Sequence, residues 1–303
     1  MPSSYFTCRP IASKALDLAS PGTIRAVARR FGVRFERKWG QTFLADRDYL
    51  DRLVSQLELT AKDRVLEIGP GLGVLTRELA QNTSAVAAVE IDPACVRALG
   101  LTLRGLSSVR IIEGDILKLA PGELIGPPYR VVGNIPYNLT GALLVQLLAQ
   151  AAAPDRIDLL LQREVAERLA APPGAWSLAT LAVRVYGEPE LELTVPPEAF
   201  YPTPKVASSL LRIVPQAQPS IPRGDLSDFF SMARAFFQAR RKQLPFALAR
   251  GLGLTGAEAK ERLRVIGIDP ARRAETLTLD EWRRLFDSER GNWKPGRSSS
   301  RSA

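Results

Sequence analysis

From about residue 62 onward, the sequence alternates short apolar runs with longer amphipathic segments. The amphipathic segments, such as VLTRELAQ, LTGALLVQLLAQ and EVAERLA, have the apolar spacing of helices. Nearly continuous apolar strands are typical of a parallel sheet that is covered by helices on both faces. The pattern therefore predicts an α/β fold built from βαβ units, with strands at RVLEIG (64–69), AVAAVEID (85–92), VRIIEGD (109–115), YRVVGN (129–134) and IDLLLQ (157–162).

The residues that follow these units predict a sheet edge and then a helical region. The runs LATLAVRVY (178–186) and VASSLLRIV (206–214) are interpreted as two strands that pair antiparallel at the edge of the sheet. The Pro-rich segment 215–225 is typical of a linker. Beyond it, the apolar spacing predicts a small all-α domain, in which Pro245 kinks or interrupts the first helix.

The net charge of +9 is concentrated at the two ends of the chain. Residues 1–41 hold eight Lys and Arg against two Asp and Glu, and residues 216–303 hold seventeen against ten. The middle of the chain has a small acidic excess. Basic ends around a separate core are typical of a protein that binds a polyanion such as nucleic acid. Solvated, Arg-rich helix faces explain the same composition equally well.

The absence of histidine from the whole sequence narrows the possible chemistry. It excludes a His base, a Ser-His-Asp triad and a His-bound metal. The two cysteines, Cys8 and Cys95, are too few for a disulfide framework or a zinc site and are typical of a reducing compartment. The N-terminal residues lack the apolar segment of a secretory signal, and no apolar run is long enough to cross a membrane. We therefore expect a cytoplasmic protein with no metal and no membrane role.

A glycine-rich loop, EIGPGLG (67–73), follows the first predicted strand and precedes a helix. Glu90 and Asp115 end the next two strands and Asn134 ends the fourth, so these groups meet at one edge of a parallel sheet. A carboxylate at Glu90 can accept the hydroxyls of a ribose, and the loop lacks both the dinucleotide spacing and the Lys of a triphosphate loop. The combination favours S-adenosylmethionine over NAD, although Glu90 or Asp115 taken alone is better explained as a solvated strand end or a helix cap.

The tetrapeptide Asn134-Ile135-Pro136-Tyr137 suits the methylation of an adenine amine. This amine is a poor nucleophile, because its lone pair is delocalised into the ring. If the Asn134 side-chain carbonyl and the main-chain carbonyl of Ile135 or Pro136 hold both hydrogens, the nitrogen becomes more tetrahedral and its lone pair can point at a sulfonium methyl group. Tyr137 offers a ring on which an extruded base can stack. The alternative is an ordinary Asn-Pro turn with a half-buried tyrosine.

With these features, the sequence resembles the ribosomal RNA adenine dimethyltransferase family, and within it the small-subunit branch. The resemblance extends from about Ser20 to Phe286. It implies a Rossmann-like class I methyltransferase fold with a mostly parallel seven-stranded sheet, an antiparallel edge strand and a small all-α C-terminal domain. The motifs that carry it are KWGQTFL (38–44), LEIGPGLGVLT (66–76), VEID (89–92), GDIL (114–117), NIPYN (134–138), LQREVAERL (161–169), AFYPTPKVASSLLR (199–212) and FFQARRKQL (236–244).

The resemblance also implies roles for individual residues. Glu90 would hold the ribose of the methyl donor and Asp115 its adenine amine. The target base would lie between Tyr137 and Phe200, although packing in the core is the alternative for Phe200. The residues implied in donor binding are Gln41, Thr42, Leu44, Gly69, Gly71, Glu90, Asp115, Ile116 and Asn134, and those implied in catalysis are Asn134, Pro136, Tyr137 and Phe200.

Three segments of the sequence depart from the pattern of the family. Thr42 stands where the family usually has Asn or His, and we expect a weaker or water-mediated donor contact there. NIPY replaces the commoner NLPY, which conserves volume. Gly141-Ala142 replaces Thr-Pro or Ser-Pro, so the start of the following helix is expected to be less rigid.

The expected organisation has five parts: an N-terminal extension (1–19), a donor-binding methyltransferase domain (20–214), a linker (215–225), a helical RNA-binding domain (226–290) and a basic disordered tail (291–303). We expect RNA phosphates to bind basic residues near the cofactor and on the helical domain, although any single one of them is better explained as a solvated side chain. They are Arg37, Lys38, Lys205, Arg240, Arg241 and Lys242.

The reaction implied by the resemblance is methyl transfer from S-adenosylmethionine to the N6 amines of two adjacent adenosines in the 3′-terminal hairpin loop of 16S rRNA. The product is N6,N6-dimethyladenosine, and the partner is the small ribosomal subunit or its precursor. We expect a monomer that acts in ribosome biogenesis. Two alternatives remain open: a 23S rRNA adenine dimethyltransferase of the macrolide-resistance type, and a non-catalytic assembly or transcription factor on the same fold.

Overall fold

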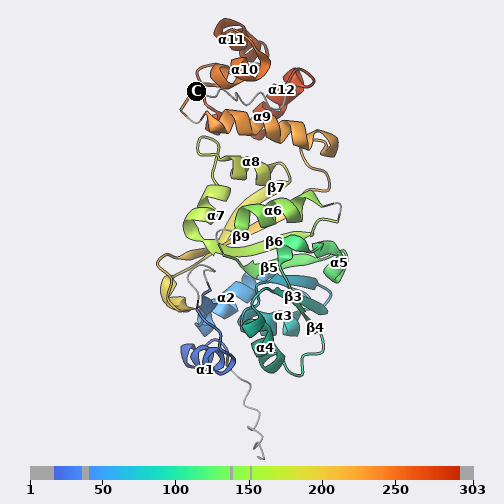
Figure 1. Ribbon diagram of the computed structural model, residues 1–303, viewed down its shortest axis with the longest axis vertical. Helices are drawn as coiled ribbons and strands as arrows, with labels where there is room; N and C mark the ends of the chain where they lie inside the picture. The colour runs from blue at the N-terminus through green and yellow to red at the C-terminus, as the bar shows by residue number, and fades with distance from the viewer. Residues whose placement is uncertain (1–16, 36–40, 137–138, 151, 240, 294–303) are drawn as a thin grey trace, which may run out of the picture.

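A seven-stranded sheet forms the centre of the protein (Figure 1). The computed structural model describes residues 17–35, 41–136, 139–150, 152–239 and 241–293. The strand order is β4-β3-β2-β5-β6-β9-β7; neighbours from β4 to β6 are parallel, and β9 is antiparallel to both β6 and β7. The strands are β2 (Arg64–Ile68), β3 (Ala85–Glu90), β4 (Val109–Glu113), β5 (Arg130–Asn134), β6 (Arg156–Gln162), β7 (Gly187–Val195) and β9 (Ser208–Pro215), and β2 to β6 confirm the five predicted strands.

Helices cover both faces of this sheet, as the continuous apolar strands predict. Val65 and Val132 pack with helices α1 to α4 in one apolar cluster, whereas Leu66 and Val131 pack with α5 to α8 in the other. Successive residues of a strand therefore serve opposite faces. The helices are α1 (Pro21–Phe31), α2 (Arg47–Leu57), α3 (Val74–Asn82), α4 (Pro93–Thr102), α5 (Pro121–Ile125), α6 (Thr140–Ala149), α7 (Arg163–Leu169) and α8 (Leu178–Arg184).

The predicted strand at 178–186 is wrong, because Leu178–Arg184 forms helix α8. Ser177 caps this helix: its hydroxyl accepts the N–H of Thr180, and the Thr180 hydroxyl accepts the N–H of Ser177. The strand that pairs with β9 is β7, whose alternating acidic residues and Pro189 are typical of an edge strand. The antiparallel strand, β9, therefore lies one strand in from the edge rather than at it.

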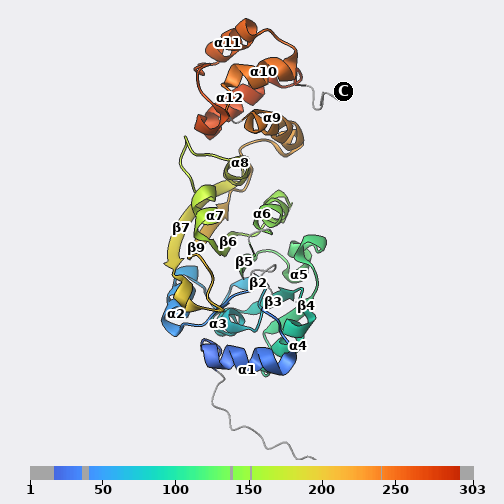
Figure 2. The ribbon, with the colours of Figure 1, turned by 60° about the vertical axis from the view of Figure 1, so that its left-hand side comes forward.

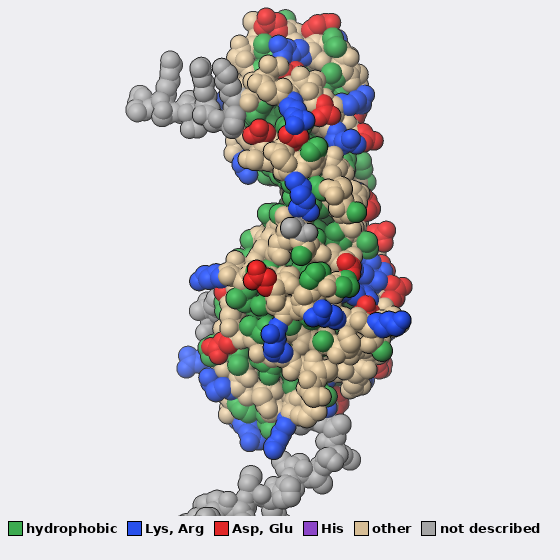
Figure 3. All heavy atoms as spheres, turned by 90° about the vertical axis from the view of Figure 1, so that its right-hand side faces the viewer, with side chains coloured by type: hydrophobic (Ala, Val, Ile, Leu, Met, Phe, Trp, Pro, Cys, Tyr) green, Lys and Arg blue, Asp and Glu red, His purple; other side chains and the backbone are tan. Residues whose placement is uncertain are grey.

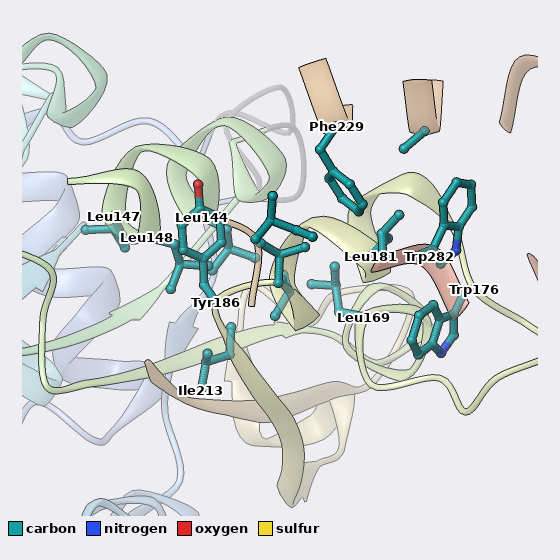
Figure 4. Close-up of a cluster of buried hydrophobic side chains, with 14 of the residues drawn as sticks. Leu144, Leu147, Leu148, Leu169, Trp176, Leu181, Tyr186, Ile213, Phe229 and Trp282 are labelled. Carbon is teal, nitrogen blue, oxygen red and sulfur yellow. The ribbon is translucent and has the colours of Figure 1, made fainter. Parts of the chain in front are cut away.

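The C-terminal helices share one apolar core with the sheet region (Figure 4). Phe229 and Trp282 belong to the same cluster as Leu181 of α8 and Ile213 of β9. Figures 1 and 2 both show α8 between the sheet and α9. The prediction for Pro245 is confirmed, since the helical region is interrupted and Pro245 lies in the first turn of a new helix. These helices are α9 (Leu226–Gln238), α10 (Leu244–Leu252), α11 (Gly256–Val265) and α12 (Leu279–Glu289).

Segments at the predicted domain boundaries are partly packed. In the predicted linker, the N–H of Gln216 donates to the carbonyl of Tyr186 at 2.7 Å, and Ile221 is buried. Leu18, near the end of the predicted extension, is also buried. Trp293, which the sequence places in the tail, is only 9% exposed. The folded part of the chain therefore extends into the predicted N-terminal extension and into the predicted C-terminal tail.

A cluster of charges holds α2 against the sheet. Asp158 of β6 is fully buried and accepts hydrogen bonds from Arg156 at 2.7 Å and Arg212 at 3.0 Å, while Arg130 lies 3.5 Å away. The three arginines come from the adjacent strands β5, β6 and β9. Each also donates to a main-chain carbonyl in the last residues of α2 or its cap, where the helix dipole favours positive charge.

Replacing Asp158 with Asn should destabilise the fold by about 3–5 kcal/mol, because buried guanidinium groups then lose their shared carboxylate. Urea unfolding followed by circular dichroism measures the loss. Asp51→Asn is a matched control: Asp51 is exposed, pairs with Arg47 at 3.1 Å, and should contribute less than about 1 kcal/mol. A loss in Asp158→Asn as small as that of the control would contradict the role of the cluster.

Glu67 of β2 is buried beside α3. It is 2% exposed, and its Oε2 atom has no hydrogen-bond partner among the described residues. Burial raises the pKa of Glu67 to about 8; the Thr76 hydroxyl lowers it and the Glu90 carboxylate raises it by smaller amounts. The Glu67 carboxyl group is therefore mostly protonated at neutral pH.

Glu67→Gln should stabilise the protein at high pH and change little at low pH. In the unfolded chain this group ionises near 4.5, whereas in the folded protein it stays protonated up to about pH 8. Its contribution to stability is thus complete below about pH 4.5 and is lost as the pH rises to about 8. Urea unfolding at both ends of this range measures the free energy of unfolding of the two proteins. Relative to the wild type, that of the variant should rise by on the order of 3 kcal/mol between the low and the high pH. An equal difference at both pH values would disprove the neutral buried state.

Candidate active site

The carboxyl ends of the parallel strands surround a cavity of about 560 Å³. Its walls come from the ends of β2, β3 and β5, from the loop after β4, and from the short strand β1 (Phe43–Leu44). This is the edge at which open α/β sheets bind ligands. The cavity brings together all nine residues implied in donor binding: Gln41, Thr42, Leu44, Gly69, Gly71, Glu90, Asp115, Ile116 and Asn134.

Three glycines shape the loop between β2 and α3. Gly69, Gly71 and Gly73 have φ angles of +70°, +57° and +86°, which residues with a Cβ atom rarely adopt. A Cβ atom at Gly71 would lie 2.5 Å from the ring of Phe43 in β1. Position 71 therefore requires glycine both for its backbone conformation and for the close approach of β1.

Glu90, at the end of β3, is bound by two main-chain groups. It is 5% exposed; Oε2 accepts the N–H of Gly71 at 2.9 Å, and Oε1 accepts the N–H of Asp92 at 2.9 Å. Burial raises the pKa of Glu90, and the two N–H groups oppose this shift. Each oxygen keeps a second lone pair that can accept a hydrogen bond from a ligand. The carboxylate thus joins the glycine loop to the end of β3 and still faces the cavity.

Asp115 and Asp92 cap the turns that follow β4 and β3. Asp115 Oδ1 accepts the N–H of Leu117 at 3.0 Å, at the start of a single 3₁₀ turn. Asp92 Oδ1 accepts the N–H of Ala94 at 2.8 Å, and its Oδ2 accepts a hydrogen bond from Gln41 Nε2 at 3.2 Å. The helix-cap interpretation of Asp115 is therefore correct, and the same side chain also lines the cavity.

Asn134 is oriented by the segment that covers the cavity. Its Nδ2 donates to the main-chain carbonyl of Thr42 at 2.9 Å, so Oδ1 is the side-chain atom left to accept hydrogen bonds from a ligand. The side chain at position 42 does not take part in this contact. Pro136 also lines the cavity, and its carbonyl accepts the N–H of Leu139 at 3.1 Å. Tyr137 lies outside the described residues.

Phe200 lies in the core rather than in the cavity wall. The short strand β8 (Phe200–Tyr201) pairs with β1, so that Leu44 is opposite Phe200. The ring of Phe200 is 2% exposed and packs in the cluster of α1 to α4. The packing alternative describes where this ring lies. Its role in stacking on a base remains a prediction that requires the ring to become accessible.

Three of the six residues predicted to bind RNA are described, and all three are exposed: Lys205, Arg241 and Lys242. The others lie outside the described residues, and they are Arg37, Lys38 and Arg240. Figure 3 shows basic and acidic side chains mixed on the side of the molecule where α5 lies. On that side the basic residues do not form a uniform patch.

Sequence reasoning missed three residues that shape the cavity: Phe43, Glu67 and Asp92. The Asp-Pro pair at 92–93 is a typical helix start and could have identified Asp92 as a cap. Glu67 opens the glycine motif, but its burial depends on the packing of α3. Phe43 has no local signal, because its contact with Gly71 joins segments that are distant in the sequence.

Neither a metal centre nor a membrane-spanning helix is present among the described residues. No three His, Cys, Asp or Glu side chains in this part of the chain come together as metal ligands. None of its helices is long and apolar enough to span a membrane.

Comparison with known sequences gives a consistent result. The ribosomal RNA adenine dimethylase family matches residues 32–289. The ribosomal RNA small subunit methyltransferase A of Dehalococcoides mccartyi is 42% identical over 282 residues, which cover 90% of this chain and 96% of the relative. The protein of the same name from Pelotomaculum thermopropionicum is 38% identical, with 89% of this chain and 97% of the relative covered.

Comparison with solved structures agrees with the sequence matches. The crystal structure of the 23S rRNA methyltransferase ErmE is 29% identical with a TM-score of 0.66, and the match covers 81% of this chain and 98% of that one. A dimethyladenosine transferase from Plasmodium falciparum shares the fold, with 20% identity, a TM-score of 0.68, and coverage of 82% and 97%. The sequence match over most of the chain, on a fold whose cavity lies at the strand ends, shows that the chain belongs to the ribosomal RNA adenine dimethylase family.

Proposed function

We propose that the protein transfers methyl groups from S-adenosylmethionine to the N6 amines of two adjacent adenosines in the 3′-terminal hairpin loop of 16S rRNA, giving N6,N6-dimethyladenosine. The observation that supports this most strongly is the cavity itself. Its glycine loop, its two acidic strand ends and the oriented amide of Asn134 come from four consecutive parallel strands and face one space.

The chemistry of the cavity suits the methyl donor. The lone pairs that remain on Glu90 can accept ribose hydroxyls, and the buried Oε1 of Gln41 has no partner among the described residues. Ile91 and Leu117, exposed by 48% and 39%, line the cavity and offer apolar surface to a purine ring. When bound, the donor supplies an electrophilic methyl carbon on a sulfonium centre.

Gly71→Ala should weaken binding of the methyl donor by about ten-fold or more. The new Cβ meets the Phe43 ring and disfavours the positive φ that lets Glu90 bind the loop. Calorimetric titration with S-adenosylhomocysteine measures the change. Gly100→Ala in α4 is the matched control, because a Cβ there meets no atom within 4 Å. Equal affinity in the two variants would contradict donor binding at the glycine loop.

The target adenine amine is activated by position rather than by a base, which fits a chain without histidine. Asn134 Oδ1 accepts one amino hydrogen, and a main-chain carbonyl of Ile135 or Pro136 accepts the other. These acceptors draw the nitrogen towards a tetrahedral shape, so that its lone pair points at the methyl carbon. Tyr137 and Phe200 are proposed to stack on the extruded base.

Asn134→Ala should lower the maximal rate of methyl transfer by about a hundred-fold or more, because one of the acceptors that shape the amine is lost. Binding of small subunits, measured by sedimentation, should stay close to that of the wild type. Asn82→Ala, at the exposed end of α3, serves as the control substitution. Undiminished transfer by the Asn134 variant would contradict the mechanism.

The small ribosomal subunit is the proposed partner, and the enzyme is proposed to act on it as a monomer in the cytoplasm during ribosome biogenesis. Relatives named small subunit methyltransferase A are 42% and 38% identical to the chain, whereas the 23S rRNA enzyme ErmE is 29% identical. The large-subunit target is the second candidate because the fold and the cavity suit it equally.

Tritiated methyl transfer to unmethylated small and large subunits tests the proposal. Nucleoside analysis should find dimethyladenosine in 16S rRNA from the small subunit. Label in 23S rRNA alone would support the second candidate. Binding of the subunit without any transfer would indicate a non-catalytic assembly factor.

A further inference from the structure

A side-chain amide from α6 holds the turn that follows β4. Two residues of this turn, Ile116 and Leu117, line the cavity. The Nε2 atom of Gln146 donates to the main-chain carbonyls of Ile116 at 3.0 Å and of Leu119 at 2.8 Å. Both hydrogens of the amide are therefore used by this one turn, residues 115–119, which we call the donor turn.

The other half of the same amide has no partner. Its Oε1 atom is buried and accepts no hydrogen bond from a described residue. A buried acceptor without a partner costs stability, and a Leu side chain would fill similar space without that cost. The presence of Gln146 at this position is therefore explained by the two bonds that it donates rather than by packing.

Helix α6 is also bonded to the segment proposed to hold the target base. The N–H of Leu139, at the start of α6, donates to the carbonyl of Pro136 at 3.1 Å, and both residues line the cavity. The carbonyl of Leu139 accepts the N–H of Leu143 at 3.0 Å, and Gln146 follows one turn later in the helix. One helix thus joins the two sides of the cavity, the donor turn and the segment that ends in Pro136.

We propose that Gln146 is a positioning residue for methyl transfer, which holds the donor turn in the shape that binds the adenine end of S-adenosylmethionine. This inference rests on the proposed function and deepens it. Three-residue helical turns have weaker hydrogen-bond geometry than an α-helix, so bonds from outside the turn contribute much of its order. Gln146 supplies two such bonds from a helix whose Leu143 and Leu147 are fixed in the core.

Gln146→Leu removes both bonds and leaves every residue of the cavity wall in place. It should raise the dissociation constant of S-adenosylhomocysteine and the KM for the methyl donor by roughly five- to fifty-fold, as expected for two lost hydrogen bonds. The maximal rate should fall by about two-fold at most, because a bound donor itself holds the turn in place. Calorimetric titration and initial rates on unmethylated small subunits measure the two effects.

Two further variants serve as controls for this substitution. Gln146→Lys keeps N–H donors on a side chain of similar reach and should restore most of the affinity. Gln81→Leu replaces an exposed glutamine in α3 and should bind as the wild type does. Wild-type affinity in Gln146→Leu, or equal losses in the Leu and Lys variants, would overturn the inference.

A double-mutant cycle with Leu117→Ala separates the proposed role from a general loss of stability. Leu117 belongs to the donor turn, is 39% exposed and lines the cavity. If Gln146 acts through this turn, the losses of affinity caused by Gln146→Leu and Leu117→Ala should not add in the double variant. Strictly additive losses would overturn the inference while leaving the proposed function intact. Failure of the wild type to bind S-adenosylhomocysteine is a different result, which would refute the proposed function and this inference with it.

Discussion

The position of α2 depends on one buried carboxylate. Asp158 forms ion pairs with the guanidinium groups of three arginines on neighbouring strands. Each of these arginines also donates a hydrogen bond to a main-chain carbonyl at the C-terminal end of α2. At the other end of the helix, Asp46 accepts the N–H of Tyr49, directly after the residues of β1 that cover the cavity. The interior strands β5, β6 and β9 therefore anchor α2, the helix that follows the β1 segment of the cavity wall.

Hydrogen bonds between side chains and main chain prepare the cavity for its ligands. Glu90 holds the glycine loop, and the Thr42 carbonyl holds Asn134. Both bonds are made within the protein and restrict the freedom of the loop and of the amide, which reduces the entropy that binding has to cost. This suits a reaction in which geometry replaces a titrating base. The proposed mechanism accordingly assigns no step to a histidine, and the sequence contains none.

Much of the fold could be predicted because burial leaves a mark on local sequence. Four of the five parallel strands are buried along most of their length, and only β4, at the edge of the sheet, is partly exposed. The glycine loop and its acidic partners end consecutive strands. The wrong strand at 178–186 and the missed strand β7 arose because local capping and charge override the pattern of hydropathy. The capping box at Ser177 turns an apolar run into α8, and alternating glutamates conceal the edge strand β7. The contact of Phe43 with Gly71 could not be predicted, because it joins distant segments.

The roles of site residues were predictable only in part. Sequence order places Asn134 at the cavity, but the hydrogen bond that its amide donates to the Thr42 carbonyl appears only in three dimensions. Phe200 shows the converse: its motif implies a contact with a base, whereas its ring is packed in the core.

The continuous core beneath α9 has a mechanical consequence. Phe229 and Trp282 pack in the same apolar cluster as Leu181 of α8. The C-terminal helices and the domain that holds the cavity therefore form one stiff body. If the proposed function holds, such a body would fix the distance between an RNA surface bound at its far end and the nucleotide that reaches the cavity. Substitutions that change the packing of Phe229 and Trp282 against Leu181 would then change which nucleotide is modified, without changing the chemistry of the modification.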